Sequence, residues 1–360
     1  MVKSLLTIAH DVVSKINQKA SATTHLMLTK RKTSRRISIC KIFAYSNWLM
    51  KLRSKTPLLL LGLALVGLLA VLAAGSIRHF STTKPARDGT LKIAASFYPL
   101  AYFTQSVAGS HADVVTITPA GAEPHDYELT AGDVATLAGA DLVVANGILE
   151  PWLPKIENEL TANGSLLVVG KSFATHYYTG TDAVPTIDPH VWLSPKIAGK
   201  MVNEITNALV RIDPAHANDY RSNKQVMQAK LASLDEDFTK GLSRCSLNTF
   251  ITSHSAFGYL AADYGLTQIS IAGLSPDADP SPQQLASVAD LAKTKNIHYI
   301  FFESLASPKL SETLAREVGT ETLALNPLEG LTKNELAAGQ NYFTEMQQNL
   351  TNLKLALGCQ

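Results

Sequence analysis

The chain has 360 residues, of which 46% are hydrophobic and 17% are charged, a composition that excludes wholesale disorder. This length exceeds what one typical hydrophobic core supports, so two domains are expected. The net charge of +2 sums two unlike parts: residues 1–56 hold 12 Lys and Arg and one acid, whereas the remaining residues hold 20 Lys and Arg and 29 acids. This acidic body argues against nucleic acid as a partner, because phosphate binding needs cationic stripes.

The N-terminal region has the layout of a secretory signal. A basic leader at 1–56 precedes an apolar segment at 57–76, whose first 18 residues are uncharged and would span about 27 Å as a helix. Met50 stands just before the last cationic stretch and is the expected start, which makes residues 1–49 an upstream extension. An uncleaved membrane anchor is the alternative. Either way the body is exported, behind a polar tether at 77–90.

Short, β-rich apolar runs alternate with helical patterns through the body. The runs are continuously apolar, which is typical of strands buried on both faces of a parallel sheet. They form two groups of four, so the sequence predicts an α/β fold of two doubly wound lobes, each with a four-stranded, largely parallel sheet. The strands are expected at LKIAAS, DVVTITP, DLVVAN and SLLVVG, and then at NTFITS, TQISIA, IHYIFFES and ETLALNP.

A long polar and amphipathic stretch separates the two groups of strands. Pro214 interrupts it, so one helix is expected to end near Ile212 and a second to run from Pro214 to about Leu242. The second helix would be roughly 40 Å long and would join the lobes as a rigid strut. The expected domains are an N-terminal lobe at 91–212, a linking helix at 213–244 and a C-terminal lobe at 245–360.

Three of the ten histidines follow predicted strands. His125 lies in AGAEPHDYE after the second strand, His190 in IDPHVWLSP after the fourth, and His254 in TSHSAFGY directly after the fifth. Open α/β sheets bind ligands beyond the carboxyl ends of their strands, so these imidazoles can meet in a cleft between the lobes. Three neutral imidazoles and a fourth ligand suit Zn²⁺. A single histidine is more often an ordinary core or loop residue, and that alternative remains open.

An ordered set of motifs runs through the body from Leu91 to Gln360. It comprises GAEPHDYELTAGDVATLAGADLVVANG, DPHVWLSP, TSHSAFGYLAADYGL, PDADPSPQQLASVADLAK, IFFES and LNPLEGLT. The set resembles the zinc- and manganese-type metal-binding proteins of ABC importers. The resemblance implies two α/β lobes joined by a long rigid helix, no enzymatic activity, and an extracytoplasmic location, either periplasmic or membrane-tethered. The implied partners are an ABC membrane permease with its cytoplasmic ATPase.

The resemblance also implies the metal ligands. His125, His190 and His254 occupy the three histidine positions, and Glu329 is the only acid in the loop LNPLEGLT that holds the fourth position. Asn326 lies in the same loop, but a neutral amide is a poor zinc ligand. The alternative is that Glu329 is a solvated carboxylate and that water completes the shell.

The expected metal is Zn²⁺, with Mn²⁺ as the alternative. Many zinc-type relatives carry a His-rich insertion before the second ligand motif, and here the stretch 171–187 holds only His176. In the other direction, His254 favours zinc, because manganese-type relatives usually have a carboxylate there and harder cations prefer oxygen. Affinity is expected to fall as the pH drops through the histidine range, because the ligands must be deprotonated.

Five further residues have expected roles around the site and in the body. Glu123, Asp126 and Glu303 are candidates for acids that fix the tautomers of the ligating imidazoles, and the alternative is that most of them are ordinary surface charges. Cys245 and Cys359 form an even pair in the body, which is compatible with one disulfide in an oxidising compartment. Similar proteins tie their C-terminal helix to the second lobe in this way, so the resemblance implies that pairing; two free thiols are the alternative.

Two other classes of function compete. A zinc-dependent hydrolase would need an open coordination position and a general base, but no HExxH motif is present and Glu329 would fill the open position. A binding protein for an organic ligand, or a surface adhesin, would instead predict an aromatic-lined cleft and no bound metal.

Overall fold

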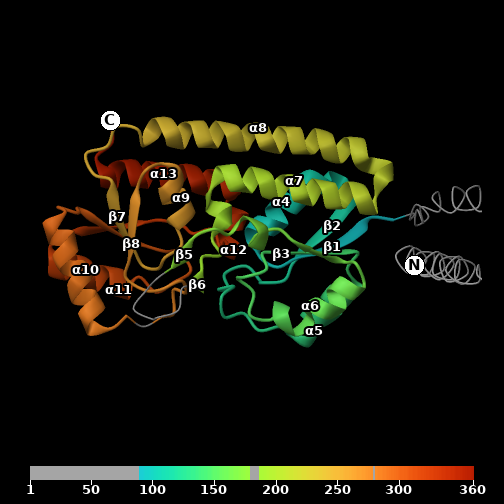
Figure 1. Ribbon diagram of the computed structural model, residues 1–360, viewed down its shortest axis with the longest axis horizontal. Coiled ribbons are helices and arrows are strands. Elements are labelled where there is room, and N and C mark those ends of the chain that lie inside the picture. Colours follow the sequence, from blue (N-terminus) through green and yellow to red (C-terminus); the bar gives the residue numbers. More distant parts are fainter. Residues whose placement is uncertain (1–88, 179–185, 279) are drawn as a thin grey trace, which may run out of the picture. The chain divides into compact units, whose positions relative to one another are not determined.

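The computed structural model describes residues 89–178, 186–278 and 280–360 (Figure 1). The predicted leader at 1–56, the apolar segment at 57–76 and nearly all of the tether at 77–90 lie outside the described residues. Within the described ranges, no helix combines the length and the apolar character needed to cross a membrane.

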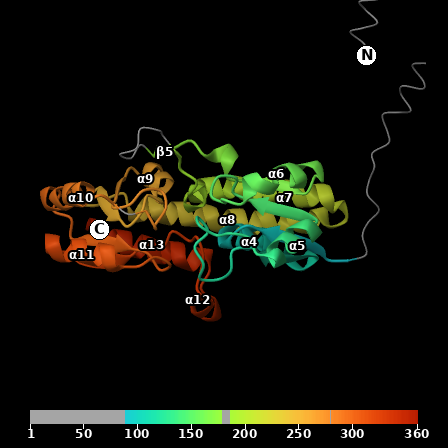
Figure 2. The same ribbon diagram turned by 90° about the horizontal axis from the view of Figure 1, so that it is seen from below.

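The first sheet is parallel and has the strand order β2-β1-β3-β4. Helices cover both of its faces, with α4 and α7 on one side and α5 and α6 on the other (Figures 1 and 2). The strands are β1 (Leu91–Ala95), β2 (Ala112–Thr116), β3 (Leu142–Ala145) and β4 (Leu166–Val168). The helices are α4 (Tyr98–Ala108), α5 (Ala131–Gly139), α6 (Leu153–Ala162) and α7 (Pro195–Ile212).

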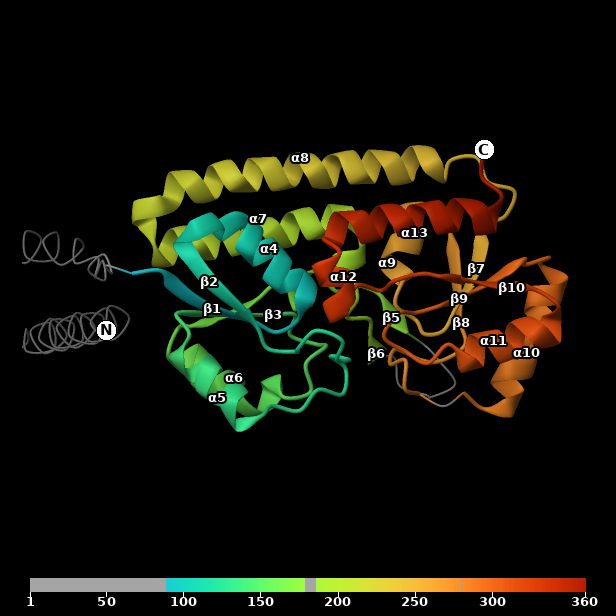
Figure 3. The same ribbon diagram turned by 180° about the vertical axis from the view of Figure 1, so that it is seen from behind.

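The second sheet is also parallel and has the order β10-β9-β7-β8. Helices α10 and α11 pack together against one face, and α13 lies along the other (Figure 3). The strands are β7 (Thr249–Thr252), β8 (Thr267–Ser270), β9 (Tyr299–Phe302) and β10 (Glu321–Ala324). The helices are α9 (Gly258–Asp263), α10 (Pro282–Thr294), α11 (Lys309–Val318), α12 (Lys333–Ala337) and α13 (Tyr342–Leu357).

The predicted α/β fold with two four-stranded parallel sheets is confirmed. Each of the eight predicted apolar runs coincides with one of these strands, although β2 begins one residue before its run, at Ala112. All four residues of β3 and of β7 are buried, as expected for strands covered on both faces. A further two-stranded antiparallel hairpin, β5 (Tyr177–Tyr178) and β6 (Thr186–Ile187), was not expected. It carries the chain from β4 to His190.

A long helix, α8 (Ala217–Gly241), links the two lobes and would measure about 37 Å. Its apolar side chains recur at helical spacing and lie in a core that includes residues of both sheets: Met227, Leu231, Leu234 and Phe238. The helix begins three residues later than expected, because Pro214–His216 form a 3₁₀ turn first. The carboxylate of Asp213 holds this turn by accepting hydrogen bonds from the His216 ring and the Tyr220 hydroxyl.

The C-terminal end of α13 is joined to the segment that precedes β7. Cys245 and Cys359 form an isolated antiparallel bridge, and their Sγ atoms lie at the bonding distance of 2.01 Å. The two residues are 114 positions apart in the sequence. The bond therefore connects the start of the second lobe to the end of the chain.

Candidate metal centre

Four loops that follow strands carry the four predicted ligands. His125 lies between β2 and α5, and His254 lies two residues after β7. Glu329 follows β10 in the loop that leads to α12. His190 follows β6 and stands directly before a 3₁₀ turn, Val191–Leu193, which continues into α7. The expectation that the ligands lie beyond strand ends is therefore correct, although for His190 the strand belongs to the small hairpin.

The four side chains meet at one point. Nε2 of His190 lies 3.2 Å from Nε2 of His125 and 3.3 Å from Nε2 of His254. Oε1 of Glu329 lies 3.1 Å from the Nε2 of His125, 3.0 Å from that of His190 and 3.3 Å from that of His254. All four donor atoms lie within 4.8 Å of one another. His190 and His254 are fully buried and Glu329 nearly so, while the His125 side chain is 11% exposed.

These distances match the edges of a tetrahedron around a zinc ion. Bonds of about 2.0–2.1 Å from zinc to nitrogen and oxygen place neighbouring ligand atoms about 3.3 Å apart. Five of the six edges of the group measure 3.0–3.3 Å. Nitrogen and carboxylate lone pairs held this close repel one another unless a proton or a cation lies between them. The donor set therefore fits one small divalent cation.

Carboxylates orient the two fully buried imidazoles. Nδ1 of His190 lies 2.7 Å from Oδ1 of Asp188, and Nδ1 of His254 lies 2.7 Å from both carboxylate oxygens of Glu303. An ionised carboxylate only accepts hydrogen bonds, so each Nδ1 carries a proton, and the neutral form of each ring presents the lone pair of Nε2 to the centre. Ser253 also donates to Glu303, which helps to fix that carboxylate.

Of the three acids expected to orient the imidazoles, only one contacts a ring. Glu303 contacts an imidazole as expected, whereas Glu123 accepts a hydrogen bond from the backbone N–H of His125 and so shapes the loop rather than the ring. Asp126 is exposed and has no hydrogen bond to the four side chains in the described part of the chain, so it orients no imidazole. Asn326 is occupied structurally, since its side chain accepts from Leu328 N and donates to Glu345.

The buried charges shift one another's protonation. Burial alone lowers the pKa of His254, but the carboxylates of Glu303 and Glu329 outweigh it and raise the pKa well above its ordinary value. The pKa of His190 is raised in the same way, by Asp188 and Glu329 against the effect of burial. For His125 burial prevails and the pKa is lowered.

The pKa values of Glu329 and Glu123 are shifted in opposite directions. Burial raises the pKa of Glu329, but the surrounding histidines outweigh this effect and hold it well below the ordinary value. Burial and the nearby Glu329 carboxylate raise the pKa of Glu123 to about 9. The centre thus contains one ionised carboxylate among three imidazoles, which suits a divalent cation.

The loop before Glu329 holds its carboxylate in a fixed place. Leu328 is fully buried and has a φ of 57°, a left-handed conformation that non-glycine residues rarely adopt. The carbonyl of Pro327 accepts a hydrogen bond of 2.8 Å from the indole N–H of Trp192. Oε2 of Glu329 is buried without a hydrogen-bond partner among the described residues. Oε1 of the same carboxylate is the oxygen that lies among the three imidazoles, so a cation at the centre would bind that atom.

Sequence reasoning missed Asp188. The residue stands two positions before His190 in IDPH, and it contacts both the backbone N–H and the ring of that histidine. Its short side chain can reach only a near neighbour, so the spacing was a necessary but not a sufficient signal. Asp126 directly follows His125 but points to solvent, which shows why proximity in sequence does not identify the acid that binds a ring.

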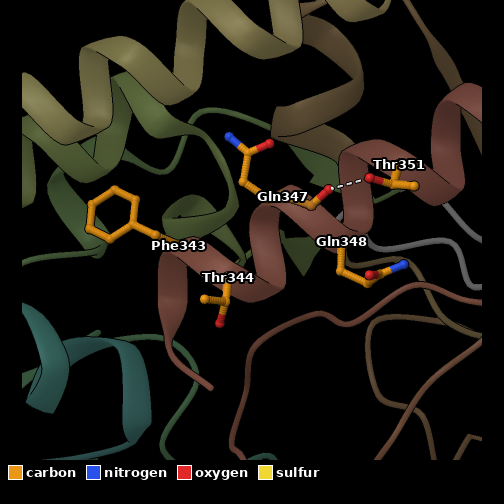
Figure 4. Close-up of a pocket in the computed structure, with 5 residues that line it drawn as sticks. All are labelled: Phe343, Thr344, Gln347, Gln348 and Thr351. Atoms are coloured by element: carbon orange, nitrogen blue, oxygen red, sulfur yellow. Dashed lines mark hydrogen bonds between the residues drawn. The ribbon is translucent and has the colours of Figure 1, made fainter. Parts of the chain in front are cut away.

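A pocket of about 370 Å³ lies along α13 (Figure 4). Its lining holds one aromatic ring together with amide and hydroxyl side chains: Phe343, Thr344, Gln347, Gln348 and Thr351. None of these residues is an acid, a histidine or a cysteine, so this pocket offers no cation ligands of the kind found at the centre.

Comparisons with known proteins show which proteins the chain is similar to. Residues 93–356 match the family described as "Zinc-uptake complex component A periplasmic". The chain is 39% identical over 293 residues to the high-affinity zinc uptake system protein ZnuA of Bacillus subtilis, covering 77% of this chain and 92% of that protein. It is 38% identical over 289 residues to the zinc-binding protein AdcA of Streptococcus pyogenes, covering 74% of this chain but only 56% of that longer relative.

A solved structure gives the same result at the level of the fold. The Zn(II)-bound ZnuA-like domain of Streptococcus pneumoniae AdcA superposes with a TM-score of 0.66 at 40% identity, covering 75% of this chain and 99% of that domain. The match to the family model extends over more than half of the chain and includes all four residues of the centre. The chain therefore belongs to the family of periplasmic component A proteins of zinc-uptake complexes.

Proposed function

We propose that this protein captures one Zn²⁺ ion with Nε2 of His125, His190 and His254 and with the carboxylate of Glu329. The observation that carries the proposal is the set of five interatomic distances of 3.0–3.3 Å among these donor atoms. The relatives described as zinc-binding proteins support the choice of metal. Three nitrogen donors and one oxygen also suit Zn²⁺ better than Mn²⁺, which prefers oxygen ligands.

The protein acts as a binding protein rather than as a hydrolase. Three neutral imidazoles and one carboxylate leave a net charge of +1 around a bound Zn²⁺ ion. The four protein ligands fill a tetrahedral shell, whereas a catalytic zinc keeps a position open for water. We therefore expect tight capture and no hydrolysis of peptides or phosphate esters by the zinc-loaded protein.

The captured ion is delivered outside the cytoplasm to an ABC membrane permease that works with a cytoplasmic ATPase. The family description, which names a periplasmic component of an uptake complex, supports this role. A disulfide between Cys245 and Cys359 also fits an oxidising compartment. Release would follow when the permease displaces the loops that carry His254 and Glu329. Mass spectrometry of the mature N-terminus tests whether the segment at 57–76 acts as a cleaved signal or as an anchor.

Metal analysis of the full chain, isolated after export, tests the proposed function. The wild type is expected to carry about one zinc per chain, and His254→Ala is expected to lose most of it. His298→Ala is the matched control, because His298 is exposed and lies outside the group of four. A wild-type protein without zinc, or a His254→Ala variant that keeps a full complement, would show that the proposal is wrong. Competition between Zn²⁺ and Mn²⁺ in the same preparation tests the choice of metal.

A further inference from the structure

We infer that Tyr259, which belongs to the second lobe, is a positioning residue for the metal ligand His190. The inference rests on the proposed function and deepens it. His190 comes from the part of the sequence that forms the first lobe, but the backbone just before it is hydrogen-bonded to α9 of the second lobe. The second lobe thus helps to set the geometry of a ligand that the sequence assigns to the first.

The hydroxyl of Tyr259 connects three backbone groups. It donates to the carbonyl of Asp188 at 2.9 Å and accepts from the N–H groups of Thr175 and His176 at 3.0 and 3.2 Å. The His176 ring stacks on the Tyr259 ring, with centroids 4.2 Å apart and an interplanar angle of 3°. Tyr259 is 3% exposed, so these bonds are shielded from water. One side chain therefore holds together the segments on both sides of the β5–β6 hairpin.

Fixing the backbone at Asp188 also fixes His190. The Asp188 carboxylate accepts from the backbone N–H of His190 at 2.9 Å and bonds to its Nδ1 at 2.7 Å. Gly258 leaves the space that this carboxylate needs, because a Cβ at that position would lie 2.8 Å from Oδ2 of Asp188. Tyr259 thus fixes the Asp188 backbone, and the Asp188 carboxylate fixes Nδ1 of His190. Because the imidazole is rigid, this also sets the direction of the lone pair on Nε2 of His190.

The second lobe also holds the chain beyond His190. Ser194, the N-cap of α7, donates a 2.5 Å hydrogen bond to Asp263 at the end of α9. The carbonyl of Trp192 accepts a 2.7 Å hydrogen bond from the hydroxyl of Tyr342 in α13. Residues of the second lobe therefore hold the ligand-bearing segment on both sides of His190. A substitution at Tyr259 in α9 should therefore shift His190 and alter metal binding without replacing any ligand.

The test compares Tyr259→Phe with Tyr264→Phe in the full chain isolated after export. Tyr264 is the matched control, since its hydroxyl donates to Asp235 of α8 and contacts no ligand. Zinc affinity is measured by chelator competition, and Co²⁺ serves as a spectroscopic probe of ligand geometry. Tyr259→Phe is expected to lower zinc affinity about tenfold and to change the visible Co²⁺ spectrum, as loss of an outer partner does. Tyr264→Phe should leave both unchanged.

A double-mutant cycle with Asp188→Ala identifies the route. If Tyr259 acts through Asp188, its replacement costs much less affinity in the Asp188→Ala background than in the wild type. Gly258→Ala, which crowds the same carboxylate, should also reduce affinity. An unchanged Co²⁺ spectrum and affinity in Tyr259→Phe, or losses that simply add in the double variant, would overturn the inference while zinc binding by the wild type stands. A wild type that binds no zinc would instead refute the proposed function.

Discussion

At the residue scale, the three histidines of the centre are not equivalent. His190 and His254 are fully buried, and each has a carboxylate on Nδ1. His125 is partly exposed, and no hydrogen bond of the described residues involves its Nδ1. Carboxylate partners raise the basicity of a ligating imidazole and fix its tautomer. Replacing an outer carboxylate should therefore weaken metal binding even though all four ligands remain.

Glu303→Gln tests this effect. The substitution keeps the size of the side chain but removes the charge that both orients His254 and accepts from Ser253. Zinc affinity is expected to fall at least about tenfold, as measured by chelator competition. Glu312→Gln is the control, because Glu312 is exposed on α11. Equal affinities for the two variants would show that Glu303 has no role in metal binding.

Zinc affinity should rise with pH. Without metal, the raised pKa values of His190 and His254 mean that these rings retain protons above pH 6.5, the ordinary histidine value. Zinc must displace these protons, so the free protein binds more protons than the loaded one and affinity increases as the pH rises through this window. His125, whose pKa is lowered, adds competition only at lower pH.

Calorimetry in two buffers of different ionisation enthalpy measures the protons released. We expect net proton release on zinc binding at pH 7, and an affinity that still increases between pH 7 and pH 8. Binding that releases no protons at pH 7 would contradict the raised pKa values of His190 and His254.

The residues themselves were only partly predictable. The positions of His125, His190 and His254 after strands predicted a shared site, because strand ends place side chains at a shared edge, and the family resemblance implied Glu329 as the fourth residue. Asp188 was not identified, whereas Asp126 was proposed as one of three supporting acids. Both lie within two residues of a ligand, and only the course of the loop decides which carboxylate turns towards the ring. Loop conformation depends on tertiary contacts such as those of Tyr259, which no local pattern reveals.

At the element scale, the loop that carries Glu329 is anchored to α13. The side chain of Asn349 accepts from the backbone N–H of Asn326 at 2.8 Å and donates to its carbonyl at 2.7 Å. Asn349 is 1% exposed, so no water is available to replace these bonds. The left-handed Leu328 lies two residues after Asn326, and its backbone N–H donates to the Asn326 side chain.

Asn349→Ala should therefore destabilise the protein. Two buried backbone groups would lose their partners, which costs about 2–4 kcal/mol in the free energy of unfolding. Asn352→Ala is the control one turn later on α13, since its hydrogen bond to the Ala324 carbonyl is exposed and its loss should cost under about 1 kcal/mol. Urea unfolding of the metal-free protein measures both. Equal losses in the two variants would contradict the anchoring role of Asn349.

Regular elements were more predictable than their ends. The eight strands followed from continuous apolar runs. Ser281, which stands directly before Pro282, caps α10 by accepting from Gln284 N. Ser307 has the same Ser-Pro pattern, but α11 begins at Lys309 and its N-cap, Pro308, makes no capping hydrogen bond. The β5–β6 hairpin has only two residues in each strand, too few for a periodic signal.

At the scale of the whole molecule, the two sheets share one hydrophobic core along α7, α8 and α13. The disulfide between Cys245 and Cys359 closes the second lobe, because the bonded residues stand 114 positions apart near its two ends. Neither cysteine is among the four residues of the centre. We therefore expect the bond to affect the stability of the fold and to leave the metal site intact.

Cys245→Ser combined with Cys359→Ser tests this separation. The entropic model gives a loss of about 4–5 kcal/mol in the free energy of unfolding for a loop of this length. Zinc affinity, measured by chelator competition on the folded protein, is expected to stay within about twofold of the wild type. Denaturant unfolding and non-reducing peptide mapping provide the comparison. A double variant as stable as the wild type would show that the disulfide does not stabilise the fold.

Extended X-ray absorption fine structure at the zinc edge of the loaded full chain tests the central claim most directly. We expect four nitrogen and oxygen neighbours at about 2.0–2.1 Å, including three imidazoles identified by their outer-shell scattering, and no sulfur. One carboxylate accounts for the remaining oxygen. A zinc ion surrounded by six oxygens, bound by sulfur or held by fewer than three imidazoles would contradict it.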